Sequence, residues 1–230
     1  ITDKTRCIVF ANPNNPTGSI FSLAKIKQIL DFIKWRDILL CLDEVYDEFI
    51  YDWQEFESAI ALYPYYKENL IIINSWSKSF GMTWWRVGYF VAHPEIAKEI
   101  LKIHDSLITC APVHSQRAAL ATFEIYDERT HKVRHQLQEK RDFAVEKLSH
   151  LTDFIEFSKP WAAYFVFPKF RYTDDDLGEC IKILNEAKLS FVPWWGFGPW
   201  WKWHFRICFW RDFDDLREWL KRLERYFIWD

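Results

Sequence analysis

Lys78 has sequence neighbours of the types that bind phosphorylated molecules. It lies in the segment S-W-S-K-S-F-G-M-T-W-W-R, with Ser75 and Ser77 before it and Arg86 eight positions after it. Serine hydroxyls are short hydrogen-bond donors, and arginine offers a planar fork that matches a phosphate group. A lysine by itself is most often a solvated side chain, so this interpretation needs support from other segments.

Three further segments place polar residues beside apolar runs. Asn12 to Gly18 reads N-P-N-N-P-T-G, Asp43 and Tyr46 lie in D-E-V-Y, and Arg206 lies in H-F-R-I-C-F. Each also has an ordinary structural interpretation: a rigid proline turn, a surface or capping carboxylate, and a strand arginine that pairs with an acid. Because aromatic residues enclose Arg206, a buried anionic partner is the stronger interpretation there.

Three apolar runs predict the strands that would position these residues. The runs Cys7–Ala11, Ile38–Leu42 and Leu70–Ile73 are continuous, as expected for parallel strands covered on both faces. Helical spacing of apolar residues after Ser22 predicts a crossover helix between the first two runs. Ligands of open α/β sheets bind at the carboxyl ends of the strands. The segments that contain Asn15, Asp43 and Lys78 each follow one of the three predicted strands.

The second half of the chain has a different pattern. Val113 to His150 contains no proline or glycine and predicts one or two long helices. Short strands are then expected near residues 154–157, 163–167 and 205–209, with helices near 174–188 and 212–227. We therefore expect an α/β fold: a mainly parallel sheet with flanking helices over residues 1–135, and a smaller α+β domain with the long linking helix over 136–230.

Composition excludes several classes of function. The 230 residues have a net charge of −3, so they lack the basic surface that nucleic-acid binding needs, and no apolar run is long enough to span a membrane. Five cysteines without a C-x-x-C pair predict free thiols in a reducing compartment, hence a cytoplasmic location. His131 and His135 are four positions apart but lack H-E-x-x-H, so no metal site is expected.

The order and spacing of the four segments resemble the aminotransferase class I and II family, fold type I of the pyridoxal-phosphate (PLP) enzymes. Asn15 precedes Asp43 by 28 residues, Asp43 precedes Lys78 by 35, and Arg206 follows Lys78 by 128. The similarity extends over essentially the whole chain. It implies the fold type I large domain followed by the family's small domain.

The resemblance implies a role for each residue at the cofactor. Lys78 would be the catalytic residue that forms a Schiff base with the cofactor aldehyde and later moves the substrate Cα proton. Asp43 would keep the pyridine nitrogen protonated, and Tyr46 and Asn15 would hydrogen-bond the phenolic oxygen. The resemblance assigns the phosphate to three further donors: Ser75, Ser77 and Arg86.

The implied activity is transfer of an amino group from an α-amino acid to a 2-oxo acid, with Arg206 holding the substrate α-carboxylate. Dicarboxylic and aromatic amino acids are both open as substrates. The resemblance also implies a homodimer. Two alternatives remain: a carbon–sulfur β-lyase that uses the same cofactor residues, and an inactive fragment that no longer binds cofactor.

The chain departs from the family pattern in two ways. The family's N-terminal part, which completes the phosphate site and stacks an aromatic ring on the cofactor, is expected to be missing. Glycine is also scarce, 6 residues against 14 tryptophans, and tryptophan stands where the family pattern has glycine. Our hypothesis is that many of these positions are glycine in the natural protein; they include Trp53, Trp84, Trp194, Trp200 and Trp201, and Ala162 takes another glycine's place.

Overall fold

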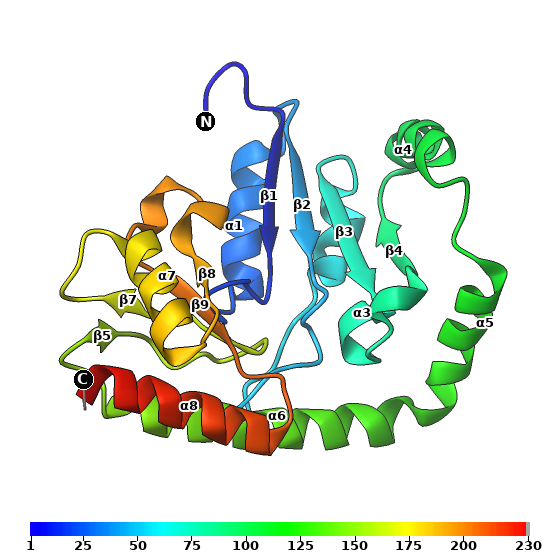
Figure 1. Cartoon of the computed structure of the whole chain (residues 1–230). Helices are drawn as coiled ribbons and strands as arrows, with labels where there is room; N and C mark the ends of the chain where they lie inside the picture. Colours follow the sequence, from blue (N-terminus) through cyan, green and yellow to red (C-terminus); the bar gives the residue numbers. More distant parts are fainter. Residues whose placement is uncertain (229–230) are drawn as a thin grey trace. The chain divides into compact units, whose positions relative to one another are not determined.

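The computed structural model describes residues 1–228, which form two compact units (Figure 1). Unit 1 contains residues 1–14 and 19–133, and unit 2 contains residues 15–18 and the chain from Arg134 onward. The four residues 15–18 thus belong to unit 2, although they interrupt the sequence of unit 1. No helix among the described residues is long and apolar enough to cross a membrane.

Unit 1 is built on a four-stranded sheet in the order β1-β2-β3-β4. Strands β1 (Cys7–Ala11), β2 (Leu39–Asp43) and β3 (Leu70–Ser75) are parallel, whereas β4 (Gly88–Val91) is antiparallel to β3. The structure therefore confirms the predicted α/β class and the three parallel strands.

Helix α1 (Leu23–Ile33) covers one face of this sheet (Figure 1). The Ser22 side chain caps it by accepting a hydrogen bond from the Lys25 amide, as its position before the apolar repeat predicts. The buried side of α1 packs on alternate strand residues and on two short helices, η1 (Ala59–Leu62) and α2 (Tyr63–Tyr66). This core contains Ile26, Leu30, Ile33, Leu40, Leu42, Leu70 and Ile72.

The opposite face of the sheet leaves apolar side chains exposed. Val9 is 67% exposed, and Ile73 and Phe90 are also exposed. The register pairs Asp43 with Ile73 and Ile73 with Phe90, so Asp43 shares this face. The sheet thus separates a packed face from the face that carries Asp43.

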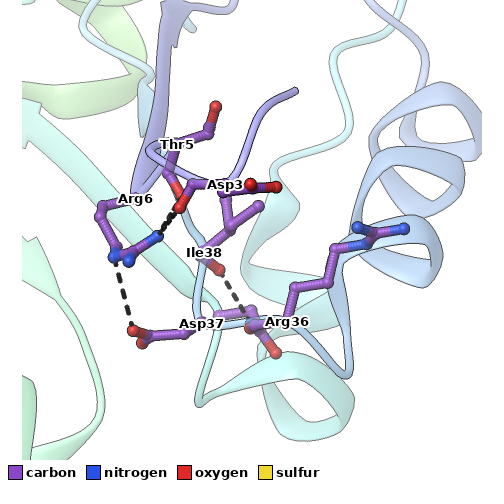
Figure 2. Close-up of polar contacts among 7 residues, drawn as sticks. Asp3, Thr5, Arg6, Arg36, Asp37 and Ile38 are labelled. Carbon is purple, nitrogen blue, oxygen red and sulfur yellow. Dashed lines mark hydrogen bonds and ion pairs between the residues drawn. The ribbon is translucent and has the colours of Figure 1, made fainter.

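Polar contacts hold together the amino ends of β1 and β2 (Figure 2). Arg6 Nη1 donates to the Asp3 carbonyl at 2.8 Å, and Arg6 Nε lies 3.7 Å from Asp37 Oδ2. The Leu39 amide donates to the Arg6 carbonyl at 2.9 Å. Since Arg6 and Asp37 are exposed, their ion pair contributes at most about 1 kcal/mol.

The remaining elements of unit 1 follow the sheet and are mostly helical. The short helices α3 (Trp76–Ser79) and η2 (Thr83–Trp85) connect β3 to β4, and they are followed by α4 (Pro94–Leu107), α5 (Val113–Ala121) and η3 (Thr122–Ile125). Helix α6 (Tyr126–Ser149) is 24 residues long and contains the boundary between the units. The predicted long helical region is thus present, divided into α5, η3 and α6.

Unit 2 contains small antiparallel sheets and two further helices. β5 (Ile155–Glu156) pairs with β7 (Lys169–Phe170), and β9 (Phe205–Cys208) pairs with both β6 (Phe165–Val166) and β8 (Val192–Pro193). The helices are α7 (Asp176–Ala187) and α8 (Phe213–Ile228), near the predicted positions. Two 3₁₀ turns, η4 (Trp194–Gly196) and η5 (Pro199–Trp201), precede β9.

The tryptophans of this chain differ in backbone conformation. Trp53 and Trp203 have left-handed φ angles of 59° and 68°, which side-chain-bearing residues rarely adopt. Among the described residues, neither Trp84, which is 93% exposed, nor Trp200 has a left-handed φ angle. Glycine would therefore relieve backbone strain at some of these positions and not at others.

Candidate active site

Asp43 and Lys78 both lie at the carboxyl end of the unit 1 sheet. Asp43 is the last residue of β2 and pairs with Ile73 in β3, and the chain passes from β3 directly into α3, which carries Lys78. Burial raises the pKa of the Asp43 carboxyl group, while the Val45 amide and the positive charge of Lys78 act in the opposite direction. The register and the chain connection thus put both residues at the same edge of the sheet.

Ser75 and Ser77 lie in the turn that presents Lys78. The Ser75 hydroxyl oxygen accepts a hydrogen bond from the Ser77 amide at 3.2 Å and caps α3. A hydroxyl that accepts one hydrogen bond can still donate its own proton to an anion. Both serines are partly buried, and both precede Lys78 within three residues.

Arg86 is tied to this turn through Thr83. The Thr83 hydroxyl donates to the Ser77 carbonyl at 2.9 Å, and Arg86 Nη1 donates to the Thr83 carbonyl at 3.0 Å. Arg86 is exposed and has a left-handed φ of 52°. The structure therefore brings the predicted phosphate donors into one loop, with the arginine head accessible to a ligand.

Tyr46 is the least accessible of the predicted residues in unit 1. It lies in the turn that follows β2, three residues after Asp43, and is only 5% exposed. Its place beside the strand end agrees with a contact to a ring held by Asp43.

In unit 2, Arg206 contacts Asn15 directly. Arg206 Nη1 donates to Asn15 Oδ1 at 2.8 Å. The guanidinium carbon lies 4.4 Å from the ring centroid of Phe165 and 5.3 Å from that of Phe197. Buried Nε has no hydrogen-bond partner, and Arg206 forms no ion pair with a carboxylate of residues 1–228. A cation enclosed in this way favours an external anion.

Gly18 fixes the loop that carries Asn15. The amides of Trp161 and Ala162 both donate to the Gly18 carbonyl, at 3.0 and 2.9 Å. Gly18 has a φ of +67°, and a Cβ there would lie 2.4 Å from the Cβ of Pro160. Only glycine fits, so this position explains why the N-P-N-N-P-T-G segment ends in that residue.

Sequence reasoning missed the two phenylalanines that hold Arg206. Phe165 pairs with Cys208 in the neighbouring strand, and Phe197 follows η4. The only signal was the aromatic excess around Arg206, which indicates a packed surrounding without identifying the rings. Among residues 1–228, no group of three potential metal ligands occurs, and His135 instead lies 3.7 Å from Glu139.

Comparison with known proteins decides the family. The sequence profile of the family "Aminotransferase class I and II" matches residues 1–223. The chain belongs to this family. Its fold is that of the fold type I aminotransferases, as the sequence resemblance predicted. Among these proteins, the putative aminotransferase YugH of Bacillus subtilis is 32% identical over 98% of this chain, and the aspartate aminotransferase of Sulfurisphaera tokodaii is 31% identical over 98%.

Solved aminotransferase structures resemble the chain over nearly its full length. The aromatic aminotransferase from Pyrococcus horikoshii superposes with a TM-score of 0.85 at 30% identity, covering 98% of this chain and 61% of that one. The aspartate aminotransferase from Thermotoga maritima gives 0.86 at 29% identity, covering 98% and 57%. The chain spans 58% of the length of YugH and 57% of that of the Sulfurisphaera enzyme.

The donor set of unit 1 fits pyridoxal phosphate. Lys78 offers a primary amine on α3, and Asp43 offers a half-buried carboxylate at the end of the neighbouring strand β2. Two hydroxyls and a guanidinium on the adjoining loop suit a phosphate group. These are the three kinds of group needed for an aldehyde, a protonated ring nitrogen and a phosphate.

Proposed function

We propose that this chain carries the cofactor lysine and the substrate-binding arginine of a PLP-dependent aminotransferase, which moves an amino group from an α-amino acid to a 2-oxo acid. The observation that supports this best is that Asp43 ends β2 and pairs with Ile73 in β3, the strand that leads directly into the α3 helix carrying Lys78. When bound, pyridoxal phosphate supplies an aldehyde that takes up amino groups and a pyridine ring that accepts electrons.

Lys78 is proposed to hold the cofactor and then to act as general base. Its Nζ atom is the amine of this site that can accept a proton from the substrate Cα and return it. The short α3 helix and the Ser75 cap fix where the lysine stem leaves the backbone. Arginine in its place would stay charged and could not accept the proton.

Asp43 is proposed to hold the proton on the ring nitrogen. Burial leaves the charged form of its carboxyl group poorly solvated and thereby raises its pKa. A poorly solvated carboxylate gains most from a cationic hydrogen-bond donor, and a protonated pyridine nitrogen is one. Tyr46, and Asn15 through its amide group, are proposed for the phenolic oxygen.

Arg206 is proposed to hold the substrate α-carboxylate, and Ser75, Ser77 and Arg86 the cofactor phosphate. Arg206 Nη1 is already oriented by Asn15, while Nε is buried and without a partner. The guanidinium edge that includes Nε can therefore donate two hydrogen bonds to a carboxylate, one to each oxygen. Relatives named as aspartate and aromatic-amino-acid aminotransferases support a dicarboxylic or aromatic amino acid as the substrate.

The test is covalent trapping on the purified 230-residue chain. The chain is mixed with pyridoxal phosphate, followed by visible absorption, reduced with borohydride and mapped by peptide mass spectrometry. We expect reduction to label Lys78 and the Lys78→Ala variant to lose the label. Equal labelling of surface lysines, with no preference for Lys78, would overturn the proposal.

A second measurement separates the reaction types. Incubation with an α-amino acid and a labelled 2-oxo acid should give a labelled amino acid if amino groups are transferred. Pyruvate and ammonia without a second 2-oxo acid would indicate a lyase instead. The control variant for Lys78→Ala in both measurements is Lys102→Arg, because Lys102 lies on α4, outside the proposed site, and pairs with Glu99.

We further propose that the protein is a cytoplasmic homodimer. The family resemblance supports the dimer, and the five cysteines, none of which forms a disulfide in the described chain, support a reducing compartment. Sedimentation equilibrium tests the first part, and cell fractionation tests the second. A monomer at all concentrations would overturn the dimer.

A further inference from the structure

Unit 1 contains a cavity outside the proposed cofactor site. Its volume is about 440 Å³, within the range of small-molecule sites. Five aromatic residues line it together with the carboxylates of Asp47 and Glu48, and we call it the aromatic cavity: Trp76, Phe80, Tyr89, Phe123 and Tyr126. Of the residues proposed for cofactor binding, only Ser75 borders it.

The strand register places two lining residues of the aromatic cavity on the other face of the sheet from Asp43. Asn74, which also lines the cavity, pairs with Tyr89, so the two side chains share a face. Asp43 pairs with Ile73, the preceding residue of β3. Because successive strand residues point to opposite faces, Asn74 and Tyr89 point away from the Asp43 face, whereas Ser75, which also borders the cavity, lies on that face.

The walls of the aromatic cavity are electron-rich. The Trp76 ring centroid lies 5.4 Å from that of Tyr89 and 6.2 Å from that of Phe123, both in edge-on arrangements. Trp76 Nε1 already donates to Thr122 Oγ1 at 3.0 Å, so the indole offers the cavity no free polar hydrogen. The π faces of such rings attract cations and are poor partners for anions.

Asp47 is a half-buried carboxylate of the cavity lining, and the Arg129 guanidinium carbon lies 5.8 Å from the ring centroid of Phe80. Asn74 Nδ2 donates to Asp47 Oδ2 at 2.7 Å, and no lysine, arginine or histidine of residues 1–228 forms an ion pair with Asp47. Burial raises the pKa of Asp47 to about 6, with a further contribution from the Asp43 charge. The same negative field, after burial, helps to raise the pKa of Tyr89. A cation in the cavity would therefore compensate an unpaired carboxylate.

We propose that the aromatic cavity binds a small organic ammonium ion, with Asp47 as its counter-charge and Trp76, Tyr89 and Phe123 around its alkyl groups. An anion would meet the carboxylates of Asp47 and Glu48, and a neutral aromatic ligand would leave the Asp47 charge uncompensated. A divalent metal ion would need several oxygen ligands, whereas the walls are mainly carbon. The site is independent of the proposed aminotransferase function.

The test compares two probes of the same shape that differ in charge. Choline carries a trimethylammonium group, and 3,3-dimethyl-1-butanol replaces its nitrogen by carbon. Ligand-observed NMR and calorimetry on the whole chain, without cofactor, should show that choline binds at least tenfold more tightly, about 1.4 kcal/mol. Equal binding of the two probes, or binding of neither, overturns the proposal.

Variants locate the site. Asp47→Asn keeps the shape and should weaken choline binding at least tenfold, whereas Glu55→Gln, the same charge change at an exposed residue of unit 1, should leave it unchanged. Phe123→Leu keeps an apolar side chain but removes one π face, and should weaken choline binding severalfold without affecting the neutral alcohol. Phe123 is exposed, so this variant should fold. Unaltered choline binding in both Asp47→Asn and Phe123→Leu contradicts the proposal.

Discussion

Arg206 Nη1 donates a 2.8 Å hydrogen bond to Asn15 Oδ1 across 191 positions of sequence. Residues 15–18 leave unit 1 to join unit 2, and Gly18 holds them there through the amides of Trp161 and Ala162. The N-P-N-N-P-T-G segment therefore does more than turn the chain after β1. It also positions the side-chain amide of Asn15, which orients the Arg206 guanidinium proposed to bind the substrate.

Replacing Arg206 by lysine should weaken carboxylate binding. Lysine keeps the charge but loses the planar fork and the contact with Asn15, so we expect the dissociation constant of a 2-oxo acid to rise at least tenfold. Calorimetry with the whole chain measures it. Arg171→Lys is the control, because Arg171 is a half-exposed unit 2 residue that pairs with Glu156. Equal effects of the two substitutions would show that Arg206 is not the carboxylate site.

Glycine at two tryptophan positions should have opposite effects on stability. Trp53 is fully exposed with a φ of 59°, so Trp53→Gly removes a left-handed strain and should raise the free energy of unfolding by up to about 1 kcal/mol. Trp84 is also exposed but lies in η2 without a left-handed φ. There, glycine should lower stability by about 0.5–1 kcal/mol through backbone entropy.

Chemical denaturation of the three proteins checks this contrast. A stabilising Trp53→Gly would support the hypothesis that glycine is the natural residue at that position. If both variants lose stability, the left-handed strain at Trp53 is not a significant cost. The purified protein's mass independently tests whether tryptophan is present as written.

Much of the fold could be predicted because its longer strands and helices have apolar patterns that extend over many residues of the sequence. Runs such as Leu70–Ile73 and the apolar repeat of α8 extend over enough residues to indicate strand and helix. Strands β5 and β6 have two residues each but lie inside the mainly apolar stretches 154–157 and 163–167. Strands β7 and β8 are equally short and contain Lys169 and Pro193, so no apolar run indicates them. They are formed by pairing with distant segments rather than by local preference.

The residues of the candidate site could be named from sequence, but not their contacts. Segment order identified Asn15 and Arg206 separately, with roles at the cofactor and at the substrate. Their hydrogen bond depends on how unit 2 assembles from both ends of the chain, which spacing does not encode. The aromatic cavity was missed for the same reason, because Asp47 and Phe123 are brought together only by the fold.

Arg141 should be one of the residues on which the stability of unit 2 depends most. Its side chain is fully buried, Nη1 donates to the Pro160 carbonyl at 2.9 Å, and Nε lies 2.6 Å from Asp142 Oδ1. Arg141→Gln should lower the free energy of unfolding by about 3 kcal/mol, because the buried Pro160 carbonyl loses its donor and Asp142 loses its cationic partner. Arg217→Gln, which breaks an exposed pair with Asp214, should cost less than about 0.5 kcal/mol. Similar losses in both variants would contradict this account.

Asp47 should make stability depend on pH in a way that Asp47→Asn removes. Burial raises its pKa in the folded chain from 3.8 to about 6, so the folded state holds more protons than the unfolded state between these values. The free energy of unfolding therefore falls as pH rises from about 4 to about 6, by at most about 3 kcal/mol, and this contribution is constant above that range. The amide of the Asp47→Asn variant would not titrate, whereas the other acids titrate in both proteins. Relative to the wild type, the variant should therefore gain stability as the pH rises from about 4 to about 6. Urea unfolding at several pH values measures the difference in free energy of unfolding between the two proteins. A difference that is independent of pH would mean that Asp47 ionises as freely in the folded chain as in the unfolded one.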